Sequence, residues 1–515
     1  MKQEERMKKI WSKTGLAALV LALLTLVVSC GSPAPAATGA PLAPAESTVS
    51  TDEWDKGAPK DLQGHDFVFL VSDSSHAHLK RNEVYAESLT GDKVNDAVFQ
   101  RNAQLEADFH CTVSQELTSD INSCKDTLLA GDYVWDFVYG PLVSMRALSS
   151  SNLFADLSAL ENLDLKKGWY DQNAISGLEI KGHLFYVTGD ASTLDERASW
   201  VVYFNRDLIE VNRLENPYDL VRNGQWTAEK MFEISEKTYV DANGNGAFDI
   251  GTDVAAVISE PLSNWMHVAA CNTRLITLDS YGELYLPATV TDEVLQVWAE
   301  LKPLLTSPHR DVSDAGSRFR KGLGGFFVCN LGTLLNFEDA ALNFGVLPMP
   351  KRNAEQEKYW TSVNRSIFCV YSIPATVDAL EDEAKAAGFQ SGREMCGYFL
   401  DAFSHASTGT LRDAFYSQVM KKQLARDPDT VEMLDLALEN KIYDPSYLYN
   451  FGGMGTLFLE CGSNGGATAG QGKATAGSDV NYDNLVSEYT KKLTAARKAL
   501  TNYLTFIDEV DNGNL

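Results

Sequence analysis

The sequence has few basic residues, few cysteines and only one long apolar run. Forty-four lysines and arginines face seventy aspartates and glutamates, so the chain of 515 residues has a formal net charge of −26. A surface this acidic repels the phosphates of nucleic acids and the headgroups of anionic lipids. The composition therefore argues against both as partners, and it is compatible with cations and neutral ligands.

The eight cysteines do not form a recognisable disulfide or metal framework. No two of them have the C-x-x-C spacing that is typical of zinc and redox sites. If Cys30 is set aside for the reason given below, seven remain, and an odd number leaves at least one thiol without an intramolecular partner. Cys111 and Cys124 are near enough in sequence to pair, but nothing in the pattern requires it.

The sequence also lacks the short motifs of common hydrolases and nucleotide-binding enzymes. G-x-S-x-G, H-E-x-x-H and the P-loop are all absent. Glycosidases use a pair of carboxylates, but no pair stands out among seventy acidic residues. Asp195 and Glu196 are adjacent, and on a strand their side chains would point to opposite faces. These absences favour a binding protein over an enzyme.

The one long apolar run lies near the N-terminus. It extends from Leu16 to Val28, follows Lys8, Lys9 and Lys13, and ends at Ser29-Cys30-Gly31. Its length suits the h-region of a secretory signal and is too short to span a bilayer as a mature helix. The end of the run resembles the lipobox of bacterial lipoproteins, whose leader is removed before a cysteine that carries diacylglycerol. The resemblance implies a signal peptide at 1–29, lipidation of Cys30 and a place on the outer face of the cytoplasmic membrane. A plain secretory leader with an incidental cysteine is the alternative.

A flexible tether is expected to follow the leader, at residues 30–58. This segment begins with a stretch rich in Ala, Pro, Ser, Thr and Gly, which cannot bury enough surface to fold. Removing residues 1–29, which carry five basic and two acidic side chains, leaves 486 residues with a net charge near −29. That length predicts two or three domains.

Strands and helices alternate in the first folded part of the chain. The predicted elements are strand 67–71, helix 92–109, a strand from 112, helix 121–130 and strand 135–140. A β-α-β-α-β order predicts an α/β fold with a parallel sheet covered by helices. Ligands of such sheets bind beyond the carboxyl ends of the strands. Asp73 and Tyr139 are therefore candidate ligand contacts.

The later part of the chain continues this mixture. The predicted strands are 200–205, 342–350 and 366–373, and the predicted helices are 225–238, 394–404, 431–438 and 482–510. Thr227 is placed to cap the first of these helices, and Trp226 beside it is expected in the core. A stretch rich in Gly and Ala at 462–478 is predicted to be a loop.

A loop that begins at Asp241 matches the calcium loop of EF-hands. Oxygen-bearing side chains stand at loop positions one, three, five and nine, with Gly246 at position six. Thr252 replaces the usual glutamate at position twelve, and Asp253 follows one residue later. The predicted calcium ligands are Asp241, Asn243, Asn245, Ala247 through its carbonyl, Asp249 and Asp253. Calcium would be structural and weakly bound; a solvated Asn-Gly turn without metal is the alternative.

Four further stretches, in order along the chain, carry a family resemblance. They are 202–208 (VYFNRDL), 223–227 (NGQWT), 343–351 (NFGVLPMPK) and 426–444. The first three are similar to the YxNKDL strand-turn, the G-x-W-T helix entry and the FGVLPMPK turn of extracellular solute-binding proteins of ABC importers. The last resembles a late helix of a clostridial-type subgroup. That family, family 1, includes sugar and oligosaccharide receptors, and many members have a calcium-type loop at this point.

The resemblance implies a two-lobed, periplasmic-binding-protein-like fold of type II. Each lobe would be a mostly parallel sheet flanked by helices, with the ligand in the cleft between them. Residues 59–189 with about 363–410 would form lobe 1, and 190–362 with about 411–515 would form lobe 2. The chain would cross between lobes near Gly189-Asp190, near 359–364 and after about Ala406. A monomer would close on its ligand by hinge motion and dock on permease subunits.

The implied ligand is a carbohydrate, most simply an oligosaccharide. Sugar sites use Asp, Glu, Asn and Arg for hydrogen bonds and flat aromatic rings for stacking. The candidate contacts at loop or crossing positions are Asp73, Tyr139, Asp190, Trp265, Trp360, Asn364 and Arg365. Asp73 could instead cap a helix, the two tryptophans could belong to the core, and Asn364-Arg365 could form an interlobe salt bridge.

Two other functions compete with a solute receptor. One is a surface-anchored carbohydrate-active enzyme, and the other is a calcium-stabilised structural lipoprotein. Turnover of a sugar would indicate the enzyme, saturable binding without turnover the receptor, and neither the structural protein.

Overall fold

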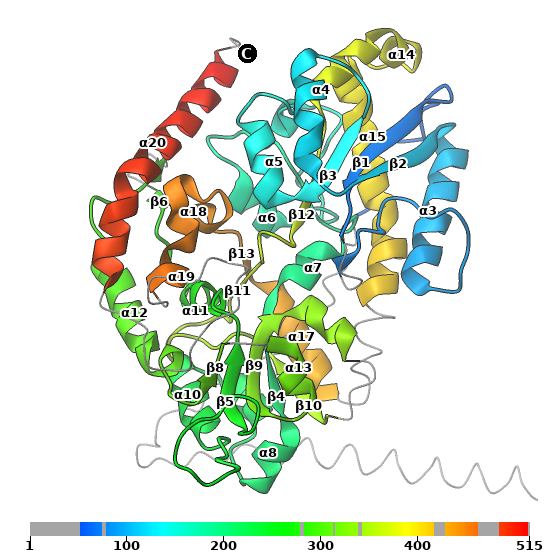
Figure 1. Ribbon diagram of the computed structural model, residues 1–515. Helices are drawn as coiled ribbons and strands as arrows, with labels where there is room; N and C mark the ends of the chain where they lie inside the picture. The colour runs from blue at the N-terminus through cyan, green and yellow to red at the C-terminus, as the bar shows by residue number, and fades with distance from the viewer. Residues whose placement is uncertain are drawn as a thin grey trace, which may run out of the picture. The chain divides into compact units, whose positions relative to one another are not determined.

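The computed structural model describes residues 52–74, 79–278, 283–312, 315–337, 342–416, 428–461 and 484–512 (Figure 1). The chain divides into Met1–Pro41 and Leu42–Leu515, and all described residues belong to the second unit. The predicted signal peptide, Cys30 and the predicted loop at 462–478 lie outside the described residues.

The first sheet has four strands in the order β12-β3-β1-β2. They are β1 (Asp66–Ser72), β2 (Thr112–Thr118), β3 (Phe137–Pro141) and β12 (Cys369–Ser372). β1 is parallel to both β2 and β3, and β12 is antiparallel to β3. The connecting helices are α3 (Lys93–Phe109), η2 (Ile121–Cys124) with α4 (Lys125–Ala130), and α5 (Leu142–Ser149). Asp92 begins α3 by accepting a hydrogen bond from the Asn95 N–H, and His110 ends it in the left-handed conformation.

The second sheet has five strands in the order β10-β4-β9-β5-β8. They are β4 (Trp200–Asn205), β5 (Ala255–Ser259), β8 (Arg310–Asp311), β9 (Gly324–Asn330) and β10 (Phe344–Leu347). β5 is parallel to β8 and β9, whereas β4 is antiparallel to β9 and β10. The prediction of mostly parallel sheets therefore holds for the first sheet, while the second is mixed because β4 runs against both of its neighbours.

Helices and short elements complete the α/β fold. Around the second sheet are α8 (Arg206–Val211), α9 (Pro217–Arg222), α10 (Ala228–Glu236), α11 (Ser263–Ala270), α12 (Asp292–Leu305), α13 (Ala315–Arg320), η4 (Leu331–Asn336) and α17 (Pro428–Glu439). The others are η3 (Leu157–Ala159), α6 (Gln172–Leu178), α7 (Leu194–Ala198), β6 (Thr277–Leu278), β7 (Leu284–Tyr285), β11 (Thr361–Ser362), η5 (Ala375–Leu380), α14 (Glu381–Ala386), α15 (Gly392–Ser407), η6 (Thr408–Arg412), β13 (Lys441–Ile442), α18 (Pro445–Leu448), η8 (Phe451–Thr456), α19 (Leu457–Cys461) and α20 (Leu485–Asp511).

The segments that connect the two sheets lie side by side. β11, between β10 and β12, pairs in parallel with β13, so that Thr361 faces Lys441. The segment that leads into β4 joins them, because Ser199 bridges Val363 and the Thr361 hydroxyl donates to the Trp200 carbonyl at 2.6 Å. Residues far apart in sequence therefore meet where the chain passes from one sheet to the other.

Several local predictions are confirmed by the structure. Thr227 caps α10 by accepting the Lys230 N–H at 3.2 Å. Trp226 is fully buried, and its Nε1 donates to the Pro348 carbonyl at 2.9 Å. The predicted C-terminal helix is α20, which buries one face that includes Tyr489 and Ile507.

Residues 52–58, which belong to the expected tether, lie in the described part of the chain. Trp54 packs edge-on against Phe109 and Tyr398, and Lys56 forms an ion pair with Asp401. These contacts fix the segment after residue 52 against α3 and α15. Among the described residues, no helix is both long and apolar enough to cross a membrane. All seven cysteines in the described part of the chain are free thiols, Cys111 and Cys124 included.

Candidate functional site

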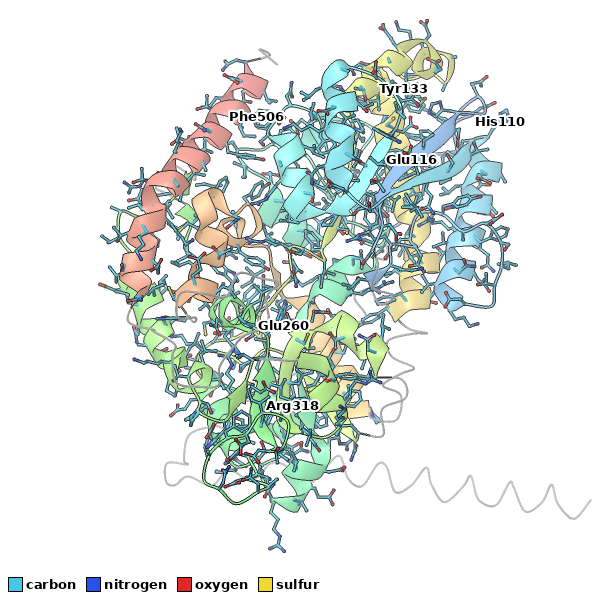
Figure 2. The ribbon with its side chains drawn as sticks, in the orientation of Figure 1. His110, Glu116, Tyr133, Glu260, Arg318 and Phe506 are labelled. Atoms are coloured by element: carbon cyan, nitrogen blue, oxygen red, sulfur yellow. The ribbon has the colours of Figure 1, made fainter. Side chains whose placement is uncertain are left out.

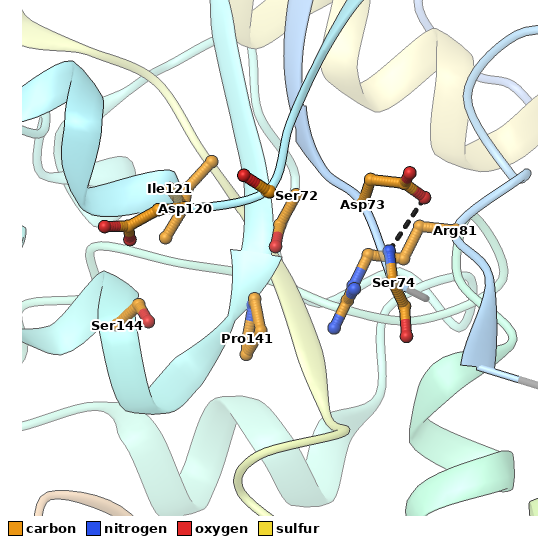
Figure 3. A pocket seen from close by; sticks show the side chains of 9 residues that line it. Ser72, Asp73, Ser74, Arg81, Asp120, Ile121, Pro141 and Ser144 are labelled. Carbon is orange, nitrogen blue, oxygen red and sulfur yellow. Dashed lines mark hydrogen bonds between the residues drawn. The ribbon is translucent and has the colours of Figure 1, made fainter. Parts of the chain in front are cut away.

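A polar hollow of 360 Å³ lies at the carboxyl ends of β1, β2 and β3. β1 contributes Ser72 and the residues after it, the loop after β2 contributes Asp120, and the first turn of α5 contributes Ser144 (Figure 3). The strands place these groups together because parallel neighbours end at the same edge of a sheet. Hydroxyls and carboxylates of this kind can hydrogen-bond a polyhydroxylated ligand, and the volume lies in the range of small-molecule sites.

Asp73 is the one predicted ligand contact that lines this hollow. Its side chain is exposed and accepts the Ser74 N–H at 2.7 Å, and its own N–H donates to the Thr118 carbonyl. Residues 75–78 lie outside the described part of the chain, so the alternative that Asp73 caps a helix stays a prediction.

Arg81 supplies a cation to the same hollow, and no sequence motif singles it out. The side chain is 8% exposed, and its Nε donates to the Cys369 Sγ on β12 at 3.0 Å. Figure 3 shows the arginine entering from the side of Asp73, across from Ser144. A buried guanidinium held in this way offers fixed donors to a ligand oxygen.

Glu260 occupies the corresponding position at the carboxyl end of β5 in the second sheet (Figure 2). Burial raises the pKa of its carboxyl above the ordinary value. Glu260 is half-buried, and in the sequence it lies between β5 and α11. A desolvated carboxyl at a strand end is a good acceptor or donor for a hydroxyl group.

Asp190 lies elsewhere, in a second polar cavity of 210 Å³. Arg412 places Nε 3.1 Å from Asp190 Oδ1, and the Thr408 hydroxyl donates to Oδ2 at 2.7 Å. Burial raises the pKa of Asp190 to about 7, although the charge of Arg412 opposes that shift. Gly189 precedes it with φ +152°, a conformation that favours glycine.

Asp195 and Glu196 line this second cavity together, so the expectation that they face apart on a strand is wrong. Both belong to the short helix α7. Lys441 of β13 places Nζ 2.8 Å from Asp195 Oδ2 and 2.6 Å from Asp171 Oδ2. Burial, with the nearby charge of Glu196, raises the pKa of Asp195 to about 8. The charge of Lys441 opposes this shift, and the two carboxylates in turn raise the pKa of Lys441.

Two of the predicted aromatic contacts fill the core. Tyr139 has no exposed surface, stacks on Tyr371 with ring centroids 4.1 Å apart and shares a hydrogen bond of 2.8 Å with the Ser192 hydroxyl. Trp265 is 2% exposed and stacks on Tyr447 at 5.2 Å. The structure assigns both rings to packing, because their faces are covered by protein.

The remaining predicted contacts lie near β11. Trp360 is half-buried, with the Lys358 ammonium 5.7 Å from its ring. Asn364 accepts the Ser366 N–H at 3.0 Å, which makes it a turn residue. The guanidinium of Arg365 donates to the Tyr447 carbonyl and lies 4.8 Å from the Tyr447 ring. Among the described residues Arg365 forms no ion pair, and an interlobe salt bridge stays a prediction.

The side chains of the predicted calcium loop are held by hydrogen bonds within the loop. The two carboxylate oxygens of Asp241 accept backbone N–H groups of two loop glycines, each at 2.7 Å. The side-chain nitrogens of Asn243 and Asn245 converge on Asp249 Oδ2 at 2.7 and 2.6 Å. The amide oxygens of Asn243 and Asn245 accept the backbone N–H groups of Asn245 at 3.0 Å and Ala247 at 2.8 Å.

The last two predicted ligands are held by the loop itself. The buried Asp253 carboxylate accepts the N–H groups of Ala242 at 3.0 Å and Asp249 at 2.8 Å, and the Ala247 carbonyl accepts the Tyr239 hydroxyl at 3.4 Å. In the part of the chain that the structure describes, no three Asp, Glu, His or Cys side chains are grouped to hold a metal. An all-oxygen set of carboxylates, amides and one carbonyl suits calcium, and calcium binding stays a prediction.

Comparison with known proteins does not assign the chain to a family. No protein-family model matches it, and no curated protein matches it.

Proposed function

We propose that this protein is the substrate-binding lipoprotein of an ABC importer, and that it captures a carbohydrate, most simply an oligosaccharide. The observation that carries the proposal is the hollow at the carboxyl ends of β1, β2 and β3. Its hydroxyls, two exposed carboxylates and one buried guanidinium suit a ligand that offers many hydroxyl groups.

The receptor would hold its ligand from two sides. The hollow of the first sheet would contribute Asp73, Arg81 and Asp120, and the end of β5 in the second sheet would contribute Glu260. The side-by-side segments that connect the sheets support a hinge between two lobes, since a few connecting residues can absorb the rotation. A lipid on Cys30 would keep the receptor close to the permease.

The proposal is tested by a thermal-shift screen of oligosaccharides with three matched proteins. The wild type should gain stability with at least one sugar, because a ligand that binds only the folded state raises its melting temperature. The double variant Asp73→Asn/Asp120→Asn should lose this shift. Asn retains the turn and cap geometry of Asp, and Asp120 caps η2, so the change removes charge while preserving local structure.

Asp126→Asn provides the matched control. Asp126 is an equally exposed aspartate in the first turn of α4, outside the hollow. Its replacement should leave the ligand-induced shift unchanged. Equal shifts in the double variant and the control would contradict the assignment of the ligand to this hollow.

A further inference from the structure

Arg81 is a buried cation in the hollow of the first sheet, and the proposed function uses it only as a hydrogen-bond donor. The residue is 8% exposed and lines the hollow. Its Nε donates to the Cys369 Sγ at 3.0 Å, whereas Nη1 and Nη2 donate to no described residue. Within the described part of the chain, Arg81 also forms no ion pair. Because arginine is rarely buried without an anionic partner, the hollow suits a ligand that brings one.

Cys369 orients the guanidinium of Arg81 without neutralising its charge. The thiol also donates to the Ile367 carbonyl at 3.2 Å, as a protonated sulfur does. Burial raises the pKa of this thiol to about 11, so the sulfur is uncharged at neutral pH. The contact therefore fixes Arg81 through Nε and leaves the charge, with Nη1 and Nη2, to the hollow.

One buried carboxylate, Glu83, acts on three buried arginines. Its Oε1 accepts the Thr193 hydroxyl at 2.6 Å and lies 3.6 Å from Arg197 Nη2. Its charge also acts on Arg81 and on Arg101. Arg101 and Arg197 are 1% and 5% exposed, and Glu83 has no exposed surface. Three buried guanidinium groups thus share this carboxylate, and an anionic group of a ligand would balance the remaining positive charge.

The two carboxylates that line the hollow leave Arg81 accessible. Asp73 and Asp120 are both exposed, so water and salt screen their charge. Figure 3 shows the carboxylate of Asp73 turned away from the guanidinium, and that of Asp120 on the far side of Ser72. They are placed to accept hydroxyl groups of a ligand, while Arg81 faces a different part of it.

We propose that the ligand of this hollow is an acidic oligosaccharide, and that the carboxylate of one uronic acid unit binds Nη1 and Nη2 of Arg81. This inference rests on the proposed function and narrows its substrate class. The flat fork of a guanidinium matches the two oxygens of a carboxylate. A phosphate group, with up to two negative charges, fits less well, because Asp73 and Asp120 line the same hollow.

The test is calorimetric titration of the full-length protein at pH 7 with oligomers of glucuronate, galacturonate and mannuronate. Each acid is compared with its methyl ester, which keeps the ring hydroxyls and removes the charge, and with the corresponding neutral oligosaccharide. At least one acid should bind saturably and about tenfold or more tightly than its ester. Added salt should weaken binding of the acid but not of the ester.

Variants locate the carboxylate. Arg81→Gln should bind acid and ester with equal affinity, and Arg81→Lys, which keeps the charge but not the fork, should retain only part of the preference. Lys80→Gln is the matched control, because Lys80 is an adjacent, exposed cation outside the hollow, and it should keep the full preference. If circular dichroism shows that Arg81→Gln does not fold, Arg81→Lys decides.

The outcomes separate this inference from the proposed function. Equal binding of acid and ester by the wild type, or an unchanged preference in the folded Arg81 variant, would overturn the inference. Binding of a neutral oligosaccharide that is lost in Asp73→Asn/Asp120→Asn, without any preference for acids, would overturn the inference and support the receptor. Absence of binding by every sugar, acidic or neutral, would contradict both.

Discussion

Replacing Lys441 by Met should destabilise the protein, and it should do so more at pH 8 than at pH 5. The ammonium of Lys441 contacts two carboxylates, Asp171 at 2.6 Å and Asp195 at 2.8 Å, and the lysine is 9% exposed. Methionine keeps most of the volume of the side chain and removes the charge. Removing one partner from a buried ion pair typically costs about 3–5 kcal/mol, because the opposite charge stays buried.

The pH dependence follows from the carboxyls that lose their partner. Burial raises the pKa of Asp195 to about 8 and that of Asp190 to about 7, above the ordinary value of 3.8. A carboxyl with a raised pKa binds its proton more tightly in the folded state, so its contribution to stability is present at low pH and is lost as pH rises to about 8. Without Lys441, whose charge lowers the pKa of Asp195, that pKa rises further, and the variant keeps its proton where the wild type has lost it. The extra cost of the substitution therefore grows only over the pH range in which the wild type ionises and the variant does not, by at most about 1.4 kcal/mol per group and pH unit.

The assay is guanidinium unfolding followed by tryptophan fluorescence at pH 5 and pH 8. Lys358→Met is the matched control, because Lys358 is exposed near β13, donates to Asn440 Oδ1 and contacts the Trp360 ring without an ion pair among the described residues. It should change the free energy of unfolding by less than about 0.5 kcal/mol. Adding Asp195→Asn to Lys441→Met should recover part of the loss at pH 8. Equal losses at both pH values, or no loss at pH 8, would refute the reasoning.

Three further predictions concern the calcium loop, the first connection between the sheets and the anchor. EDTA should lower the melting temperature by roughly 3 °C or more, and calcium should restore it. Asp241→Asn should remove this response. Identical melting curves with and without calcium would contradict a calcium site in this loop. Gly189→Ala should lower the free energy of unfolding by more than about 1 kcal/mol. The added Cβ would lie 2.1 Å from the Trp169 carbonyl oxygen, at a φ of +152°. Gly316→Ala on α13, where an added Cβ meets open space, should be neutral or stabilising in the same denaturation assay. Cys30→Ser should release the protein from the membrane fraction with unchanged ligand affinity, and loss of binding in the soluble form would show that anchor and site are not separate.

Local patterns predicted the main elements of the fold. The apolar period of residues 92–109 corresponds to α3, and the apolar run at 67–71 corresponds to β1. Both signals depend on neighbours in sequence, so one sequence suffices to read them. Asp73 was also accessible to this reasoning, because a polar residue that follows a parallel strand lies at the ligand-binding edge of the sheet.

Contacts between distant residues could not be predicted in this way. β11 and β13 are two residues long and carry no periodic signal, yet their pairing brings Lys441 beside Asp195, 246 positions earlier in the chain. Tyr139 stacks on Tyr371 because β12, which lies more than two hundred residues later in the chain, pairs with β3 in the first sheet. Glu260 follows an apolar strand just as Asp73 does, so the same rule applied to residues 255–259 would have identified it.

The most direct test of the central claim is titration of the purified protein with the oligosaccharide that gives the largest thermal shift, followed by chemical analysis of the recovered sugar. The receptor assignment predicts saturable binding at one site per chain, recovery of the sugar intact, and loss of binding in Asp73→Asn/Asp120→Asn but not in Asp126→Asn. Cleavage of the sugar, or no binding by any oligosaccharide in the screen, would contradict it.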